Sequence, residues 1–313
     1  MRKFLLKLLV YTSIITVISF SLNVLYVHKV KEDVDKFSNV PNQIQVCNFG
    51  SSHGYYGFNY DDVPANYTCF NFALSSQSLV YDYKILQYYE DKIQNGAIVF
   101  IPVSYFSLFG KPEHETKDFA SKNKRYYKFL PSELITQYDW KTDLYVNWLP
   151  PLSPASLVKL TKIILGIDSD DNSWEKKADP ADVTEDASHA YERHIEKDRK
   201  ISGKRIRCDE AFDALYGIIE LCRKIGTRPI LVTVPYLKEY TDTVRKRDPE
   251  FYGAFYAVVD EVRRKAVVEY YDYAFDERFT QSYELFMNSD HLNREGARIF
   301  TDILFREVLG IEL

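Results

Sequence analysis

A serine and a histidine far apart in the chain could together carry out nucleophilic chemistry. Ser52 lies in the stretch FGSSHGYYGFNY, directly after the β-rich run QIQVCN, and His291 lies in NSDHLNREGA, directly before the last helical segment. A serine hydroxyl becomes a nucleophile when an imidazole takes its proton and a further group orients that imidazole. We therefore expect Ser52 to be a nucleophile and His291 to be its general base.

The other five histidines suit this role less well. His28 flanks an apolar N-terminal segment, and His53 is adjacent to the serine, where neighbouring side chains seldom point together. The remaining three lie in a polar stretch, where a solvent-exposed surface is the expected environment: His114, His189 and His194. Both motifs also have simpler interpretations, a turn for GSSHG and a helix N-cap for DHLN. Their joint occurrence in one chain favours a site.

Five β-rich runs separated by helical stretches are expected to position these residues. The runs cover residues 43–49, 67–73, 97–103, 228–234 and 266–272. Continuously apolar runs such as IVFIPV suit parallel strands that are buried on both faces. Strand–helix alternation predicts an α/β three-layer sandwich around a five-stranded parallel sheet. The turn after the first strand and the loop before the last helix then share the edge of the sheet where ligands bind.

Residues 110–205 interrupt this alternation. The segment contains LPPLSPASL and DSDDNSWEKKADPADVTED, in which prolines and acidic runs replace the β-rich pattern. Such composition is typical of loops and irregular helices. We expect an insertion that is partly helical and caps the domain.

The N-terminal segment is apolar enough to be a membrane anchor. Residues 1–7 carry three basic side chains, and residues 8–27 carry no charged one. Twenty apolar residues suffice to span a hydrocarbon core of ~30 Å. We expect an uncleaved transmembrane helix over 8–27, with residues 1–7 in the cytoplasm, a stalk over 28–42, and a domain over 43–313 outside the cell membrane. A cleaved signal peptide and a buried soluble helix are the alternatives.

Composition argues against several other functions. The net charge of −5, without a basic stripe, gives no electrostatic footprint for nucleic acid. No phosphate-binding or dinucleotide fingerprint and no cysteine–histidine spacing for a metal appears, so neither cofactor nor metal is expected. Four cysteines occur at positions 47, 69, 208 and 222. We expect buried free thiols, although an external location would also permit two disulfides.

The first motif resembles a sequence block of the SGNH (GDSL-type) hydrolases, in the membrane-anchored group whose first block reads G-S-S. Gly50, Ser51 and Ser52 fill that block, so the resemblance implies that Ser52 is the nucleophile. NFALSSQ resembles the second block, with Ala73 at the glycine position. The backbone N–H groups of Ser52 and Ala73 are then implied as oxyanion donors. The third block normally contains an asparagine, for which Ser104 in SYFSLFG is a weak substitute.

The last motif resembles the fifth block, D-x-x-H, around His291. Asn288 stands where the family has its aspartate, and the resemblance implies that it orients the imidazole. An amide oxygen can accept a hydrogen bond from imidazole but brings no charge. Asp290 is the nearest charged alternative, although a side chain adjacent to the histidine is expected to point elsewhere. A weakened triad, a Ser–His dyad and a silent site all remain open.

The resemblance covers roughly residues 43–109 and 228–307 and implies a flavodoxin-like strand order. It implies an extracytoplasmic serine esterase or acyltransferase that acts on acetyl or D-alanyl esters of a cell-envelope glycopolymer. The implied partners are an acylated polysaccharide or teichoic-acid-like polymer, the membrane, and a membrane acyltransferase. A catalytically silent, membrane-tethered accessory that binds a glycopolymer or a partner protein is the alternative, motivated by Asn288 and the insertion.

Overall fold

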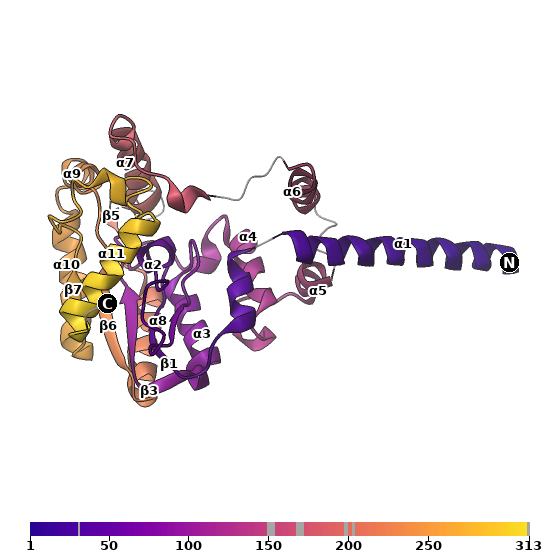
Figure 1. Ribbon diagram of the computed structural model, residues 1–313, viewed down its shortest axis with the longest axis horizontal. Coiled ribbons are helices and arrows are strands. Elements are labelled where there is room, and N and C mark those ends of the chain that lie inside the picture. Colours follow the sequence, from indigo (N-terminus) through magenta and orange to yellow (C-terminus); the bar gives the residue numbers. More distant parts are fainter. Residues whose placement is uncertain (31, 149–153, 167–171, 197–199, 202–203, 312–313) are drawn as a thin grey trace. The chain divides into compact units, whose positions relative to one another are not determined.

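The computed structural model describes residues 1–30, 32–148, 154–166, 172–196, 200–201 and 204–311 (Figure 1). The chain forms two compact units. Unit 1 comprises Met1–Asn39 and Asp118–Asn172, and unit 2 comprises Val40–Lys117 and Ser173–Leu313. The boundaries expected from the sequence pattern, at residues 28, 43 and 110–205, are not tested by this division and stay a prediction.

Unit 2 is built on a five-stranded parallel sheet. Its strands are β1 (Ile44–Asn48), β2 (Cys69–Asn71), β3 (Ile93–Pro102), β6 (Arg228–Thr233) and β7 (Glu269–Asp272). They lie in the order β2-β1-β3-β6-β7, and every neighbouring pair is parallel. This arrangement confirms the predicted α/β class, the five parallel strands and the flavodoxin-like order.

The apolar runs of the sequence form the middle of this sheet. In β3, Val99, Phe100 and Ile101 are fully buried, and in β6, Ile230 and Val232 are fully buried. Strands covered on both faces have no solvent side on which to place polar residues, which explains the absence of alternation. The edge strands β2 and β7 are shorter and only partly buried.

The helices of unit 2 cover both faces of the sheet. They are α2 (Ser52–Gly57), α3 (Leu79–Tyr89), α7 (Val183–Tyr191), α8 (Asp209–Lys224), α9 (Lys238–Arg247), α10 (Phe251–Ala266) and α11 (Arg294–Leu304). Helix α8 contacts α3 and α10, whereas α2 contacts α11. Right-handed crossovers place α3, α8 and α10 on one face of the sheet and α2 and α11 on the other. The sheet and the helices on its two faces form the three layers of the predicted sandwich.

The predicted insertion is mostly helical. It contains α4 (Phe119–Asn123), α5 (Trp140–Trp148), α6 (Pro154–Ile164) and α7, together with an antiparallel ribbon of β4 (Lys200–Ile201) and β5 (Lys204–Arg205). Helices α4 to α6 belong to unit 1 and α7 belongs to unit 2. The four cysteines carry free thiols, and all but Cys69 are buried.

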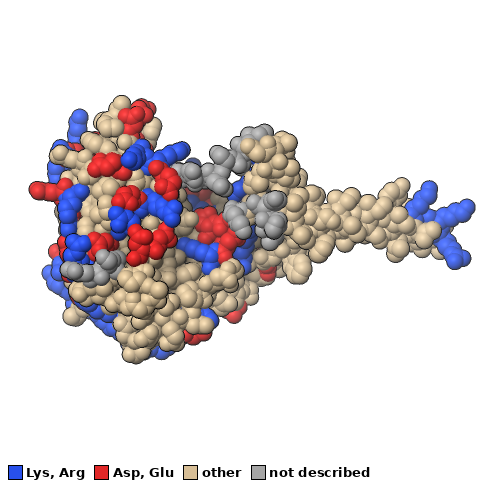
Figure 2. Space-filling view, viewed as in Figure 1, with Lys and Arg blue, Asp and Glu red and all other residues tan. Residues whose placement is uncertain are grey.

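Helix α1 (Arg2–Lys29) is long and apolar enough to cross a membrane. The qualifying stretch, Arg2–Tyr26, has 25 residues and would extend about 37 Å at ~1.5 Å per residue. Figure 2 shows an uncharged surface along this helix beyond the basic side chains at its N-terminal end. Length and composition therefore suit a membrane span.

Candidate active site

A tight turn at the end of β1 presents Ser52 at the edge of the sheet. Gly50 begins the turn with a φ of +112°, in the region that side-chain-bearing residues rarely adopt. A Cβ on Gly50 would lie 3.2 Å from the ring of Pro102, and one on Gly54 would lie 2.3 Å from the carbonyl oxygen of Phe49. The two glycines of GSSHG are therefore required for the turn. Ser52 becomes the first residue of α2.

The loop before α11 brings His291 to this serine. His291 Nε2 lies 2.8 Å from Ser52 Oγ, and His291 Nδ1 lies 3.1 Å from Asn288 Oδ1. Because an amide oxygen can only accept, the Nδ1–H donates to Asn288. The free lone pair of Nε2 then faces the hydroxyl of Ser52. The structure thus connects Ser52, His291 and Asn288 in series through the two ring nitrogens. Their roles as nucleophile, base and orienting group stay predictions.

Asn288 also shapes the loop itself. Its Oδ1 accepts the backbone N–H of Asp290 at 3.2 Å and that of His291 at 2.9 Å. This turn of the Asx type folds the loop back on itself. As a result, the side chains of Asp290 and His291 can approach each other although they are adjacent in sequence.

Asp290 is fully buried beside the imidazole of His291. Its Oδ1 lies 3.3 Å from His291 Nδ1, and its Oδ2 lies 3.2 Å from His53 Nε2 and 3.2 Å from His194 Nδ1. Arg193 Nη2 lies 3.7 Å from Oδ1. The expectation that Asp290 would point away from His291 is therefore wrong. A carboxylate is available to the candidate base after all.

The basic neighbours keep Asp290 ionised. Burial opposes the charged form, but the nearby His291 and His194 and the hydrogen bond from His53 hold the pKa of Asp290 well below its usual value. Burial lowers the pKa of His53 to about 4 and that of His194 well below its usual value. At neutral pH, the cluster therefore contains one carboxylate with His53 and His194 uncharged.

His194 corrects the expectation of a solvent-exposed side chain. It is only 8% exposed and follows α7 in a short π-helical turn, whereas His114 and His189 are exposed as expected. The sequence did contain the signal, because Ala187, Ala190, Tyr191, His194 and Ile195 follow the helical period of a buried face. All five of these residues are buried.

His53 connects Asp290 to the ends of two central strands. Its Nδ1 lies 2.8 Å from Ser104 Oγ, after β3, and 3.2 Å from Tyr236 Oη, after β6. Ser104, expected as a weak oxyanion donor, instead has its hydroxyl against His53. The adjacent Ser52 and His53 point to different partners, as expected for neighbours in sequence.

The two implied oxyanion donors differ in the structure. Ser52 opens α2, where a backbone N–H has no partner within the helix. The N–H of Ala73 donates to Asn71 Oδ1 at 3.0 Å. Asn71 in turn donates to the carbonyl groups of Gly54 and Phe58 in the α2 segment. An oxyanion at Ala73 would have to share this N–H, so its role stays a prediction.

The same cluster offers groups that could hold a cation. Ligand atoms of His53, Asp290 and His291 all lie within 4.8 Å of one another. Nitrogen and carboxylate donors of this kind suit zinc and related metals. A metal on His291 Nδ1 would, however, leave the proton on Nε2, which could then no longer accept from Ser52. Metal binding and the Ser52–His291 pair are thus alternative uses of these residues.

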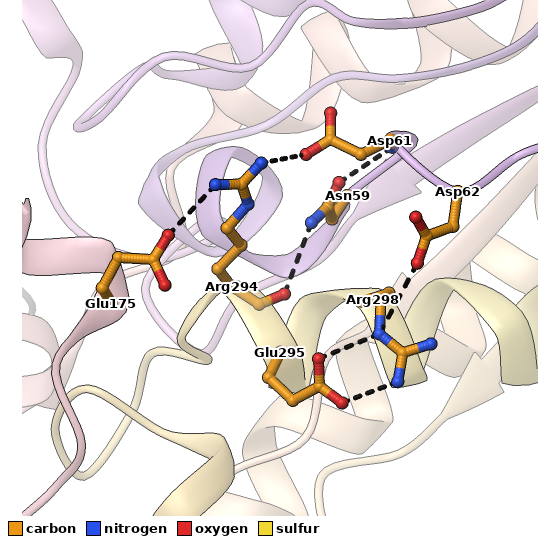
Figure 3. Close-up of a pocket in the computed structure, with 7 residues that line it drawn as sticks. All are labelled: Asn59, Asp61, Asp62, Glu175, Arg294, Glu295 and Arg298. Atoms are coloured by element: carbon orange, nitrogen blue, oxygen red, sulfur yellow. Dashed lines mark hydrogen bonds and ion pairs between the residues drawn. The ribbon is translucent and has the colours of Figure 1, made fainter.

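A charged cavity of about 170 Å³ lies between the loop that follows α2 and the start of α11. It is lined by Asn59, Asp61, Asp62, Glu175, Arg294, Glu295 and Arg298. Figure 3 shows Arg294 between Asp61 and Glu175, at 2.6 and 3.1 Å, and Arg298 between Glu295 and Asp62, at 2.6 and 3.7 Å. Each guanidinium group is thus bound to two carboxylates. The cavity offers no free cation for an anionic ligand.

Aromatic side chains stand between this cavity and the candidate base. The ring of Tyr56 is 5.7 Å from that of His291 and 6.2 Å from that of Trp174, measured between centroids. Trp174 immediately precedes Glu175, one of the residues that line the cavity. The imidazole of His291 is thus packed beside an aromatic ring, and the residue is only 8% exposed.

Sequence comparison gives no relative: no family model matches the chain, and no curated protein matches it. Two solved structures superpose on most of its length. The "putative acylhydrolase" of Bacteroides fragilis NCTC 9343 is 10% identical, with 90% of this chain and 99% of that chain covered and a TM-score of 0.40. The "putative platelet activating factor" of Streptococcus pneumonia is 10% identical, with 96% and 98% covered and a TM-score of 0.42. Likenesses this distant carry no argument about function.

Proposed function

We propose that unit 2 is a serine esterase or acyltransferase with Ser52 as nucleophile and His291 as general base. The observation that carries the proposal is the 2.8 Å contact between Ser52 Oγ and His291 Nε2. The Asn288 acceptor on the opposite side of the ring supports it, because it fixes the tautomer that a base requires.

In the proposed reaction, Ser52 Oγ attacks the carbonyl carbon of an ester while His291 Nε2 takes the hydroxyl proton. The N–H of Ser52 stabilises the oxyanion that forms, and a donor of this kind contributes ~3–4 kcal/mol in comparable sites. His291 then gives its proton to the leaving alcohol, and an acyl-serine remains. Water completes a hydrolysis, whereas the hydroxyl group of an acceptor completes a transfer.

Asp290 would serve as the charged partner of His291. The imidazole becomes positively charged while it holds the proton of Ser52, and a buried carboxylate 3.3 Å away stabilises that charge. Asn288 would then set the orientation of the ring, and Asp290 would supply the charge. Two residues thus share the role that one aspartate has in the family that the sequence resembles.

The finer assignments rest on the resemblance and on the apolar helix α1. They are a single-pass membrane anchor, a domain outside the cell membrane, and acetyl or D-alanyl esters of an envelope polysaccharide or teichoic-acid-like polymer as substrates. The resemblance extends to the D-alanyl-lipoteichoic acid transfer proteins, for which a membrane acyltransferase is the expected partner.

One observation favours the silent accessory as a second candidate. Asn71 already occupies the N–H of Ala73, so one of the two implied oxyanion donors is engaged within the protein. A silent accessory would bind a glycopolymer or partner without forming a bond to Ser52, and its binding would survive Ser52→Ala.

Labelling with a serine-directed fluorophosphonate separates the two candidates. The full chain should form one adduct on Ser52, located by peptide mass spectrometry, and Ser52→Ala should lose both the adduct and hydrolysis of a model acetyl ester. Ser51→Ala is the matched control, because the buried Ser51 hydroxyl has no hydrogen-bond partner among the described residues. Absence of an adduct in the native chain, or labelling that persists in Ser52→Ala, would contradict the proposal that Ser52 is the nucleophile of an enzyme.

Membrane topology is tested separately. If α1 is an uncleaved anchor, full-length protein should remain in the membrane fraction, and protease added to spheroplasts should degrade unit 2. A shortened, soluble form outside the cell would show that the segment is a signal peptide.

A further inference from the structure

Helix α5 in unit 1 carries an apolar stripe that nothing in the described residues covers. Trp140, Leu144 and Trp148 follow one another at intervals of four, which places them on one face of the helix. Trp140 is 63% exposed and Trp148 is 69% exposed. Indole rings are rarely left in water in this way, and an apolar surface of this kind marks an interaction site.

Helix α6 shows a similar face. Leu157, Val158 and Ile164 are exposed on one side, and Leu165 extends the same surface beyond the end of the helix. Leu160, on a different side of α6, is buried instead. Helix α6 therefore has two apolar sides, of which one is packed against the protein and the other is exposed.

The packed side of α6 meets the end of α1. Leu160 forms a small core with Tyr26 and Val30, against which Leu25 and Ile163 also pack. Tyr26 is the last residue of the stretch that could cross a membrane. Helix α6 is thus attached at the point where the chain would leave the hydrocarbon.

Helix α5 is tied to the same region through the 3₁₀ turns η4 (Lys124–Lys128) and η1 (Asp33–Asn39). Asn147 donates to the carbonyl of Tyr127, and the backbone N–H of Asp139 donates to the Tyr127 hydroxyl. Turn η4 contacts η1, which begins only four residues after the end of α1. Lys128 Nζ lies 2.6 Å from Glu32 Oε2.

We infer that α5 and α6 lie in the interface of the lipid bilayer that α1 crosses, with their exposed tryptophan and aliphatic side chains among the headgroups and upper acyl chains. Tryptophan gathers at this depth, because its ring is apolar and its N–H is polar. Amphipathic helices bind there by burying their apolar face beside basic residues. Lys141, Lys159 and Lys162 on these two helices suit anionic headgroups.

A bilayer fits better than a protein partner because α6 packs on Tyr26 and Val30, directly at the end of the stretch that could cross a membrane. The inference rests on the proposed membrane anchoring of α1 and goes beyond the proposed reaction. It implies that unit 1 holds its helices flat on the membrane instead of serving as a flexible stalk.

Quenching of tryptophan fluorescence by brominated lipids tests the inference on the full chain. The chain is placed as single copies in nanodiscs of phosphatidylcholine and phosphatidylglycerol with bromine at different acyl-chain depths. One variant keeps only Trp148, through Trp140→Phe and Trp174→Phe. The matched control keeps only Trp174 of unit 2, through Trp140→Phe and Trp148→Phe.

Trp148 should lose most of its emission to lipids brominated near the headgroups, less to deeply brominated lipids, and little to iodide in the water. Trp174 should show no bromine quenching. A Trp148 that iodide quenches and bromine does not, in discs that carry the chain, would overturn the inference. Shielding from both quenchers would also overturn it, in favour of a protein surface. A chain that fails to enter the discs would overturn the anchor, and with it this inference, without bearing on Ser52.

Discussion

Two fully buried carboxyl groups lie behind the turn that presents Ser52, and their pKa values are shifted in opposite directions. Asp82 Oδ1 accepts the N–H of Gly50 at 2.9 Å and the side-chain amide of Gln77 at 2.6 Å. Burial raises the pKa of Asp82 to about 7, although both hydrogen bonds oppose the rise. Asp290 is equally buried, yet its pKa lies well below the usual value.

The difference shows that neighbours, more than burial, decide which buried carboxyl group carries charge. Asp82 faces neutral amides, and nearby Glu113 raises its pKa further. Asp290 faces three histidines and an arginine. Only Asp290 is therefore suited to stabilise a positive imidazolium across the physiological pH range, whereas Asp82 holds the backbone of the turn.

The largest effect should come from Asp290→Asn. Loss of the charge beside His291 is expected to lower turnover of a model ester by about two to three orders of magnitude, the cost of removing one group that stabilises charge in the transition state. Steady-state kinetics and a thermal melt of the same sample separate catalysis from folding. Asp82→Asn is the control and should keep most of its activity. Equal activity of the two variants would remove the distinction between the carboxylates.

Asp82→Asn should instead change stability. The pKa of Asp82 is about 7 in the folded state against an ordinary 3.8, so the folded protein binds more protons between these values, and the free energy of unfolding falls as the pH rises from 4 to 7. At 1.36 kcal/mol per pKa unit, the loss is on the order of 4 kcal/mol.

The asparagine variant keeps the acceptor oxygen and lacks this loss. It should match the native chain near pH 4 and exceed it above pH 7, as measured by denaturant unfolding in a mild detergent. If the free energy of unfolding changes with pH equally in both proteins, the pKa of Asp82 is not raised in the folded state.

His53 should produce a smaller effect of opposite sign. Burial lowers its pKa to about 4 from 6.5, so the unfolded chain binds more protons between these values, and stability falls as the pH drops. The loss from pH 7 to pH 4 is roughly 3 kcal/mol. His53→Gln should lessen this acid sensitivity by that amount and leave the part that comes from the buried His194, whereas the exposed His189→Gln should leave it unchanged. A His53→Gln variant with the native pH dependence would assign the sensitivity to other groups.

Asn288→Asp should have the smallest effect. The substitution preserves the Oδ1 acceptor for the ring and for both backbone N–H groups, and Asp290 already supplies a negative charge. We expect turnover to rise by a few fold at most, measured on the same model ester. A gain of several orders of magnitude would mean that Asp290 does not act on the imidazole.

Much of the fold could be predicted because its signals are local. β-rich runs marked all five strands, and their alternation with helices predicted a parallel sheet, whose strand order was implied by the family resemblance. The meeting of Ser52 and His291 was expected from topology, because the turn after the first strand and the loop before the last helix share one edge of the sheet. The start of β3 at Ile93 instead of 97 is a local error, since Ile93 pairs with Ile44 of β1 ahead of a shift in register.

The surroundings of the base could not be predicted in the same way. The approach of Asp290 to His291 depends on a turn held by Asn288, and turns of this kind leave little trace in sequence spacing. His194 reaches Asp290 from a segment that sequence composition described only as polar. Ala73 was read from a motif position, whereas the hydrogen bond from its N–H to Asn71 depends on tertiary placement.

The separation of 239 residues between Ser52 and His291 has a consequence for biosynthesis. Chains emerge from the ribosome N-terminal end first and fold as they lengthen. Helix α1 and the turn that carries Ser52 are therefore made long before the loop that carries His291. A growing chain that is already attached to the membrane would hold a serine without its base until the loop of His291 has also been made. If the proposed pair is catalytic, chains that terminate before His291 would carry Ser52 without reactivity.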